Sequence, residues 1–417
     1  MATLLEPLAS IVDNALAGNK DTELFAAVAI GASIVTSFAS VFNFLTHVPT
    51  QRISKSYAEG DFGKVEMNFH TALLIALALG VFCSTFLFLG RDWLLELTNT
   101  PEELFQTAKE YFSIRLIAVP LFLVFTVLLS LLRGIKQVTF VFVLLFIVTS
   151  LNILLSYFFL YQLDYGARGI AAGTVIAHTV GILIAIFRIQ FIDKFDVIPK
   201  PKNIEIDTFK SLGSDGFNMF GRTLVLTASF YLLTRTAAAM GTEKLAAYQL
   251  GLQGWLFSSF FIDGFAMSGT ILTAESYARK DWETLKQLGI KLRNLCLALG
   301  SLICIGLLVF ENQFFNFFSS DQAIFEVLDE SWWIVCIAQI PLSYSYLLDG
   351  HIFGLGDYAF LRKHMIIGFC LSILPTLFLA NYISLEIQHL WIGLLLLGLY
   401  RFLSGFFRWQ RFLNAKF

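Results

Sequence analysis

The chain is poor in charge and in the motifs on which enzyme chemistry depends. Charged residues make up only 14% of its 417 residues, whereas soluble domains contain roughly a quarter. The sequence has no glycine-rich phosphate loop after a strand, no cluster of metal ligands and no nucleophile with a base at workable spacing. We therefore expect neither an enzyme nor a bound cofactor or metal. No basic tail or nucleic-acid motif is present, so we expect no nucleic-acid partner.

Paired cysteines and a cleavable signal peptide are also lacking. The five cysteines lie in apolar stretches without paired spacing, and we interpret them as buried thiols. The first apolar segment has no basic region before it and runs directly into Asp13, which argues against a signal peptide. From Leu4 to Gly18 it would form roughly 22 Å of helix. The first helix is therefore predicted to be short, because it is truncated or because the start lies inside it.

Apolar residues are abundant instead. They make up 57% of the chain, whose mean hydropathy is +0.71. The apolar runs are long enough to cross roughly 30 Å of hydrocarbon, which takes about 20 helical residues. We expect an all-α polytopic membrane protein in a lipid bilayer. Its twelve transmembrane helices are predicted at roughly 3–18, 24–50, 67–90, 106–132, 138–162, 167–190, 208–240, 243–273, 284–310, 323–354, 358–381 and 388–412.

One pattern occurs twice in the chain. Residues 22–31 align with residues 242–251, an offset of 220, and the same offset aligns 56–62 with 276–282 without a gap. Two equal halves in an apolar chain suggest a transporter, because such proteins commonly place a substrate site between two repeated bundles. We expect an N-terminal six-helix lobe at 1–190, a cytoplasmic linker at 191–207 and a C-terminal six-helix lobe at 208–417.

Basic residues predict the orientation of the spans. Most Lys and Arg residues lie in the connections after the even-numbered spans and at the C-terminus, so the positive-inside rule puts both termini in the cytoplasm. The opposite connections carry only Lys20, Arg91, Lys109, Arg168 and Lys244. Four tryptophans near the predicted external ends fit an aromatic belt at the membrane surface, namely Trp93, Trp332, Trp333 and Trp391.

Several segments, taken in order, resemble one family of membrane proteins. Residues 7–15 (Pro-Leu-Ala-Ser-Ile-Val-Asp-Asn-Ala), 111–115 (Tyr-Phe-Ser-Ile-Arg) and 166–174 are similar to helices of the multidrug and toxic compound extrusion (MATE) transporters. The second half resembles the DinF branch of this family at residues 222–224, 245–247, 262–266 and 349–354. The similarity covers nearly the whole chain.

The resemblance implies cation-coupled export of amphipathic, often cationic organic compounds by alternating access. The coupling ion would be H⁺ or Na⁺, the substrate a small organic molecule, and the transporter a monomer in the cell (inner) membrane. The lack of a nucleotide-binding motif favours secondary transport over ATP-driven transport. Two alternatives stay open: a flippase for lipid-linked saccharides or similar amphiphiles, and a MATE-like protein that has lost coupling.

Asp13 is the first candidate for ion coupling. The resemblance implies this role, because an acidic residue on the first helix is the usual coupling group of the N-terminal lobe. A charge at the bilayer centre costs about 3 kcal/mol or more, so ionisable residues inside the membrane are functional candidates. Burial pushes a carboxyl toward its neutral form, and contact with water lets it release the proton. The alternative is that Asp13 only caps a helix end.

Three polar residues are expected around Asp13. Asn152 and Ser156 are four residues apart, so they share one face of the fifth helix, and Thr174 follows on the sixth. The family usually has Asp at the position of Ser156, and this departure removes a carboxylate from the usual proton relay. Alternatively, the three side chains only hold neighbouring helices together.

Arg222, Asp263 and Asp349 form the second set of candidates, in the C-terminal lobe. We expect Asp263 and Arg222 to form a buried ion pair that stabilises this lobe. In the repeat alignment Asp263 stands opposite Asn43, so only one lobe is acidic at this depth. Asp349 is predicted either to be a second cation site or to be the partner of Arg222.

Overall fold

The computed structural model describes residues 12–98, 100–199, 205–318, 322–379 and 386–416. Within these ranges the chain is helical and contains no strand, which confirms the predicted all-α fold. The predicted first span is described only from residue 12, in a helix over residues 12–20 that contains Asp13. The rest of that span and residues 200–204 of the predicted linker lie outside the described residues.

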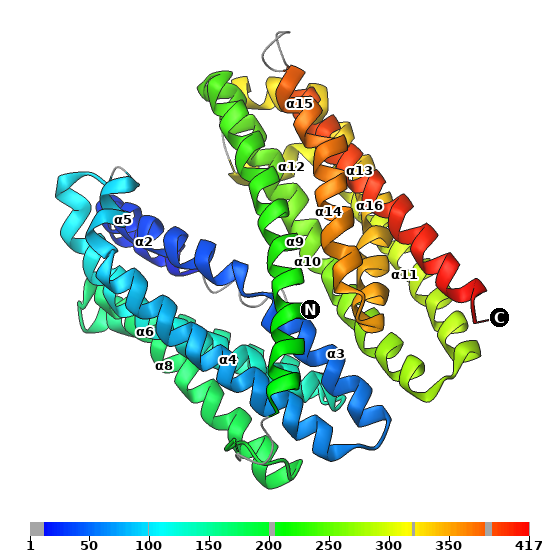
Figure 1. Cartoon of the computed structure of the whole chain (residues 1–417). Coiled ribbons are helices and arrows are strands. Elements are labelled where there is room, and N and C mark those ends of the chain that lie inside the picture. Colours follow the sequence, from blue (N-terminus) through cyan, green and yellow to red (C-terminus); the bar gives the residue numbers. More distant parts are fainter. Residues whose placement is uncertain (1–11, 99, 200–204, 319–321, 380–385, 417) are drawn as a thin grey trace. The chain divides into compact units, whose positions relative to one another are not determined.

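The chain divides into two compact units, Met1–Gly216 and Phe217–Phe417. The division lies inside α9 (Ile206–Ala239), beyond the linker predicted at 191–207. After the helix over 12–20, the first unit contains α2 (Thr22–Val41), α3 (Phe44–Ala58), α4 (Phe62–Leu89), α5 (Arg91–Leu97), α6 (Glu102–Gly134), α7 (Val138–Tyr157) and α8 (Gly166–Phe187) (Figure 1). Short π-helical turns extend two of these helices, η1 (Phe158–Gln162) and η2 (Arg188–Ile192).

The second unit continues with seven further helices in the part of the chain that the structure describes. They are α10 (Thr242–Arg279), α11 (Trp282–Val309), α12 (Glu311–Phe318), α13 (Gln322–Leu355), α14 (Tyr358–Leu371), α15 (Ile373–Leu379) and α16 (Ile387–Asn414). Within this unit α13 is central, because it packs against α10, α11, α14 and α16. It therefore carries side chains toward several neighbours at once.

Eight spans among the described residues are long and apolar enough to cross a membrane. Together with the helix over 12–20, the α2–α3 segment, α9 and α13, they correspond to the twelve predicted transmembrane helices. The short helices α5 and α12 were not predicted; they connect spans rather than cross the membrane.

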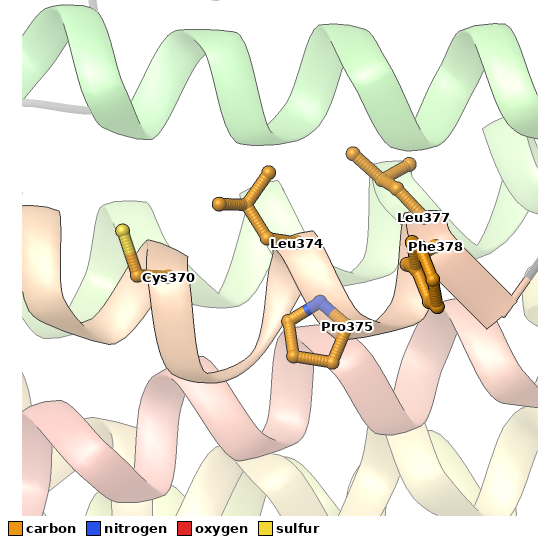
Figure 2. Close-up of a pocket in the computed structure, with 5 residues that line it drawn as sticks. All are labelled: Cys370, Leu374, Pro375, Leu377 and Phe378. Carbon is orange, nitrogen blue, oxygen red and sulfur yellow. The ribbon is translucent and has the colours of Figure 1, made fainter.

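Two predicted spans are interrupted. The span expected at 24–50 is two helices, because α2 ends at Val41 and α3 begins at Phe44. The span expected at 358–381 breaks at Ser372, between α14 and α15. Pro375 follows three residues later, and its ring nitrogen has no hydrogen to donate to the preceding turn. An apolar pocket of about 580 Å³ lies at this break, and Figure 2 shows Cys370 and Leu374 on the same side of the interrupted helix.

The two units repeat the same local geometry at the offset seen in the sequence. Asp61 accepts a hydrogen bond of 3.0 Å from the backbone of Lys64 and caps α4, and Asp281 caps α11 through Thr284 at the same distance. Aromatic rings from the two sides of each cap meet edge-on in both units. The centroids are 5.9 Å apart for Tyr57 and Phe62 and 5.8 Å apart for Tyr277 and Trp282.

A glycine lets two helices approach closely at matching places in both units. A Cβ atom on Gly134 of α6 would lie 2.4 Å from the side chain of Ile53 on α3. A Cβ atom on Gly354 of α13 would lie 2.6 Å from the side chain of Thr273 on α10. At distances this short the added carbon would force the neighbouring side chain or helix to move. Both helix pairs can therefore pack this closely only because glycine has no side chain.

The expected aromatic belt is wrong for two of its four tryptophans. Trp332 and Trp391 are fully buried in the core of the second unit, where Trp391 stacks on Tyr248 with ring centroids 4.9 Å apart. Trp93 and Trp333 are exposed, as a belt residue should be. Trp332 and Trp333 are neighbours in the sequence, so only the rotation of α13 separates a core residue from a surface one.

Candidate functional site

Asp13 is a buried carboxylic acid with few partners. Its side chain is only 6% exposed. The Ser156 hydroxyl and the Arg115 guanidinium interact with it electrostatically. Even so, Asp13 Oδ1 has no partner at hydrogen-bonding geometry among the described residues. A buried oxygen without a donor is costly, which makes this atom a place where a proton or a cation would be stabilised.

The three polar residues predicted around Asp13 do come together. Asn152 Nδ2 of α7 donates to Thr174 Oγ1 of α8 at 3.0 Å. A Cβ atom on Gly173 would lie 3.0 Å from Ser156 Oγ, so α7 and α8 approach closely at this level. Asn152 Oδ1 and Ser156 Oγ are also buried and have no hydrogen-bond partner within the described ranges. The cluster of the first unit therefore contains several oxygens that lack a donor.

Arg115 belongs to this cluster although sequence reasoning did not assign it there. It lies on α6, and it acts on both Asp13 and its helix neighbour Tyr111. An arginine inside an apolar helix was the signal that could have identified it, because such residues are rarely without function. Its charge offsets part of the cost of ionising Asp13.

The C-lobe cluster, as we call Arg222, Asp349, His364 and Arg401, is arranged differently. Asp349 Oδ2 of α13 accepts one hydrogen bond from Arg222 Nη2 of α9 at 2.5 Å and another from Arg401 Nη2 of α16 at 2.6 Å. His364 Nε2 of α14 lies 3.8 Å from the other oxygen, Oδ1. Asp349 and Arg401 are 2% and 3% exposed, and Arg222 is 11% exposed. Four helices thus meet at one carboxylate.

Glycines on α13 turn Asp349 toward this cluster. A Cβ atom on Gly350 would lie 2.2 Å from the backbone oxygen of Ala266 on α10. Thr270 Oγ1 of α10 donates to the oxygen of the same glycine at 3.1 Å. Because the next residue along the helix faces α10, Asp349 faces away from it, toward α9, α14 and α16.

Arg222 pairs with Asp349, which is one of the two roles predicted for Asp349. The helix turn of α9 that carries Arg222 lies against α14, where a Cβ atom on Gly221 would be 3.1 Å from Arg362. The guanidinium of Arg222 lies over the ring of Phe353 on α13, 5.3 Å from its centroid. Asp263 is half-buried on α10, a different neighbour of α13.

A polar pocket of about 750 Å³ lies at the predicted external end of the first unit. Two ion pairs border it, one between Lys20 and Asp164 and one between Arg168 and Glu110. The Lys20 side chain pulls the pKa of Asp164 below its ordinary value through a hydrogen bond and through its charge. No residue of either buried cluster lines this pocket or the apolar one at α14 and α15.

Comparisons with known proteins agree with this arrangement. The sequence model of the family described as MatE matches residues 1–158 and 219–378. Protein DETOXIFICATION 44, chloroplastic, of Arabidopsis thaliana is 25% identical over 420 residues, which cover 98% of this chain and 80% of that protein. DNA damage-inducible protein F of Escherichia coli (strain K12) is 25% identical over 415 residues, with coverage of 97% and 88%.

A solved structure shares the fold. The crystal structure of a MATE protein in the bent conformation superposes with a TM-score of 0.91 at 17% identity, and the match covers 100% of this chain and 93% of that one. The family model covers most of both halves of the sequence. The chain therefore belongs to the MATE family, whose members are multi-pass membrane transporters and not enzymes.

Proposed function

We propose that the protein is a secondary antiporter that exports amphipathic organic compounds in exchange for H⁺ or Na⁺, with Asp13 as the coupling residue. One observation carries this proposal. Asp13 Oδ1, Asn152 Oδ1 and Ser156 Oγ are buried and have no hydrogen-bond partner among the described residues. A proton on the carboxyl would supply a donor, and a cation would be ligated by the same oxygens.

Coupling follows if the cation and the substrate favour different states of the transporter. A ligand shifts an equilibrium only through its different affinities for the two states. Loading Asp13 satisfies the buried oxygens and favours the state in which this cluster is closed to water. Release of the cation leaves a buried charge and favours a state in which water reaches it. The protein would lie in the cell (inner) membrane with both termini in the cytoplasm, as the basic residues predict.

Gradient-driven transport tests this proposal. Purified protein in proteoliposomes would be given a pH gradient and, separately, a sodium gradient, and efflux of a fluorescent amphipathic compound would be followed. Asp13→Asn should abolish gradient-driven efflux while the protein stays folded. Asp92→Asn is the matched control, because Asp92 is an exposed carboxylate paired with Lys109, and it should transport normally. Coupled efflux retained by Asp13→Asn would remove Asp13 from the mechanism.

A flippase for an amphiphile with an acidic head group is the second candidate. The C-lobe cluster favours it, because two arginines share one carboxylate. Names of relatives favour export instead, since two bacterial relatives are each called a probable multidrug resistance protein, NorM. Gradient dependence separates the two functions. Lipid movement without any gradient would favour the flippase.

A further inference from the structure

The C-lobe cluster has an excess of positive charge. Two guanidinium groups face one carboxylate, so the group carries one net positive charge even when His364 is neutral. Asp349 is the only carboxylate that interacts electrostatically with His364 and Arg401 in the part of the chain that the structure describes. The nearby Asp357 already binds another arginine, Arg408, at 2.5 Å.

A buried charge without a counterion is expensive, since burial removes its hydration and nothing replaces it. The arginines of the C-lobe cluster show this deficit directly. Arg222 Nε and Arg401 Nε are both buried and have no hydrogen-bond partner within the described ranges. His364 Nε2 lacks a partner as well, although its other ring nitrogen, Nδ1, lies 2.6 Å from Ser404 Oγ. Within the described residues, three nitrogen atoms of this cluster and one carboxylate oxygen, Asp349 Oδ1, thus have no hydrogen-bond partner.

We propose that the C-lobe cluster binds an anionic group, a carboxylate or a phosphate, on the transported compound. The inference rests on the proposed transport function and names a charge that its substrate carries. An incoming anion would neutralise the excess charge and share the guanidinium groups with Asp349. Arginine suits this task because its planar fork matches carboxylate and phosphate oxygens.

Aromatic rings around the cluster suit the apolar part of such a compound. Arg401 lies over the ring of Tyr346, 5.1 Å from its centroid, and Arg222 lies over Phe353. Phe360 stacks on His364 with ring centroids 5.2 Å apart. Arg222 is the least buried member, so it is the group that an anion would reach first.

Arg222→Gln is the most informative variant. It removes the excess charge and leaves the balanced buried pair of Asp349 and Arg401, so the protein should fold. Arg222→Lys keeps the charge but loses the planar fork. Arg408→Gln is the matched control, because it removes one arginine of the same unit outside the C-lobe cluster.

Binding to the purified full chain in detergent, without any gradient, provides the test. The probes are benzoate, lauryl phosphate, inorganic phosphate and the cation tetraphenylphosphonium, titrated by calorimetry. We expect each anion to bind Arg408→Gln as tightly as it binds the native chain. Arg222→Gln should weaken anion binding by about tenfold to a hundredfold, which corresponds to the loss of one charge-assisted hydrogen bond. The anion affinity of Arg222→Lys should lie between those of the native chain and Arg222→Gln. Unchanged anion affinity in folded Arg222→Gln, or no anion binding by the native chain, would overturn the proposal.

The same titrations separate two sources of the anion and two kinds of failure. Stronger binding of lauryl phosphate than of inorganic phosphate indicates a lipid-like head group, whereas equal binding indicates a free anion; either result supports the site. Asp13→Asn should bind anions normally but fail to transport. If the native chain binds anions and no gradient drives efflux, the coupling proposal fails and the anion site stands.

Discussion

Asp13 in the first unit and Asp349 in the second are both almost fully buried, but their surroundings are opposite. Each carboxylate has one oxygen without a hydrogen-bond partner among the described residues. A single arginine, Arg115, acts electrostatically on Asp13. Asp349 receives two arginines directly on one oxygen. The first carboxyl can exchange a proton or a cation at low cost, because few direct bonds hold its charged form. The second is held as an anion, because releasing it would leave two buried guanidinium groups unpaired.

This difference has arisen on a shared frame. Helix caps, aromatic pairs and close glycine contacts recur in the two units at the same offset. The buried charges do not recur, since the position equivalent to Asp349 in the first unit is Leu129. Packing is thus conserved between the two units while the electrostatic function has diverged. This contrast is the basis for proposing coupling in the first unit and binding in the second.

The same change at the two carboxylates should give the largest contrast. Asp349→Asn leaves two buried arginines without a counterion, and breaking such a group typically costs about 3–5 kcal/mol. Asp13→Asn removes a carboxyl with one unsatisfied oxygen and should change stability by less than about 1 kcal/mol. Melting temperatures in detergent, followed by tryptophan fluorescence, provide the measurement. Equal losses in both variants would show that the two sites are held in the same way.

Alanine at the matching glycines tests the shared frame, with a smaller effect. Gly134→Ala and Gly354→Ala both place a Cβ atom against a neighbouring helix, and overpacking of this kind costs about 1–3 kcal/mol. Gly306→Ala on α11 is the control, because no atom lies within 4 Å of the added carbon. It should be neutral or should stabilise the helix by up to about 1 kcal/mol. Loss of stability in only one unit would argue against a common frame.

Glu311, at the start of α12 outside the spans, should show the smallest effect. Burial and the neighbouring Asp329 carboxylate raise its pKa to about 7. A neighbouring arginine would instead lower the pKa of an acid. The folded chain therefore keeps a proton that the unfolded chain releases near pH 4.5, so stability falls as the pH rises from there to about 7. Glu311→Gln should raise the melting temperature at pH 8. The gain in the free energy of unfolding should be at most about 1 kcal/mol, because the site is partly exposed. No gain at pH 8 relative to pH 5 would contradict this.

Local features were predictable because their causes are local. Asp61 and Asp281 could be matched from the sequence, since a cap depends on residues within three positions. Long apolar runs likewise predicted the spans, because hydrocarbon thickness sets their length. The breaks at Asn43 and Ser372 escaped prediction, since the surrounding residues are apolar on both sides.

The amino-acid sequence alone determined that this chain is a membrane-embedded helical repeat and that Asp13, Asn152, Ser156 and Thr174 could share one site. Helical periodicity puts Asn152 and Ser156 on one face of a helix, and the resemblance to the family implies the place of Asp13 in the site. Only the tertiary structure decided that Arg222 binds Asp349 and that Arg401 joins them. The choice of partner depends on how each helix is rotated about its axis and on how closely glycines such as Gly350 let neighbouring helices approach. The spacing of residues along one helix determines neither.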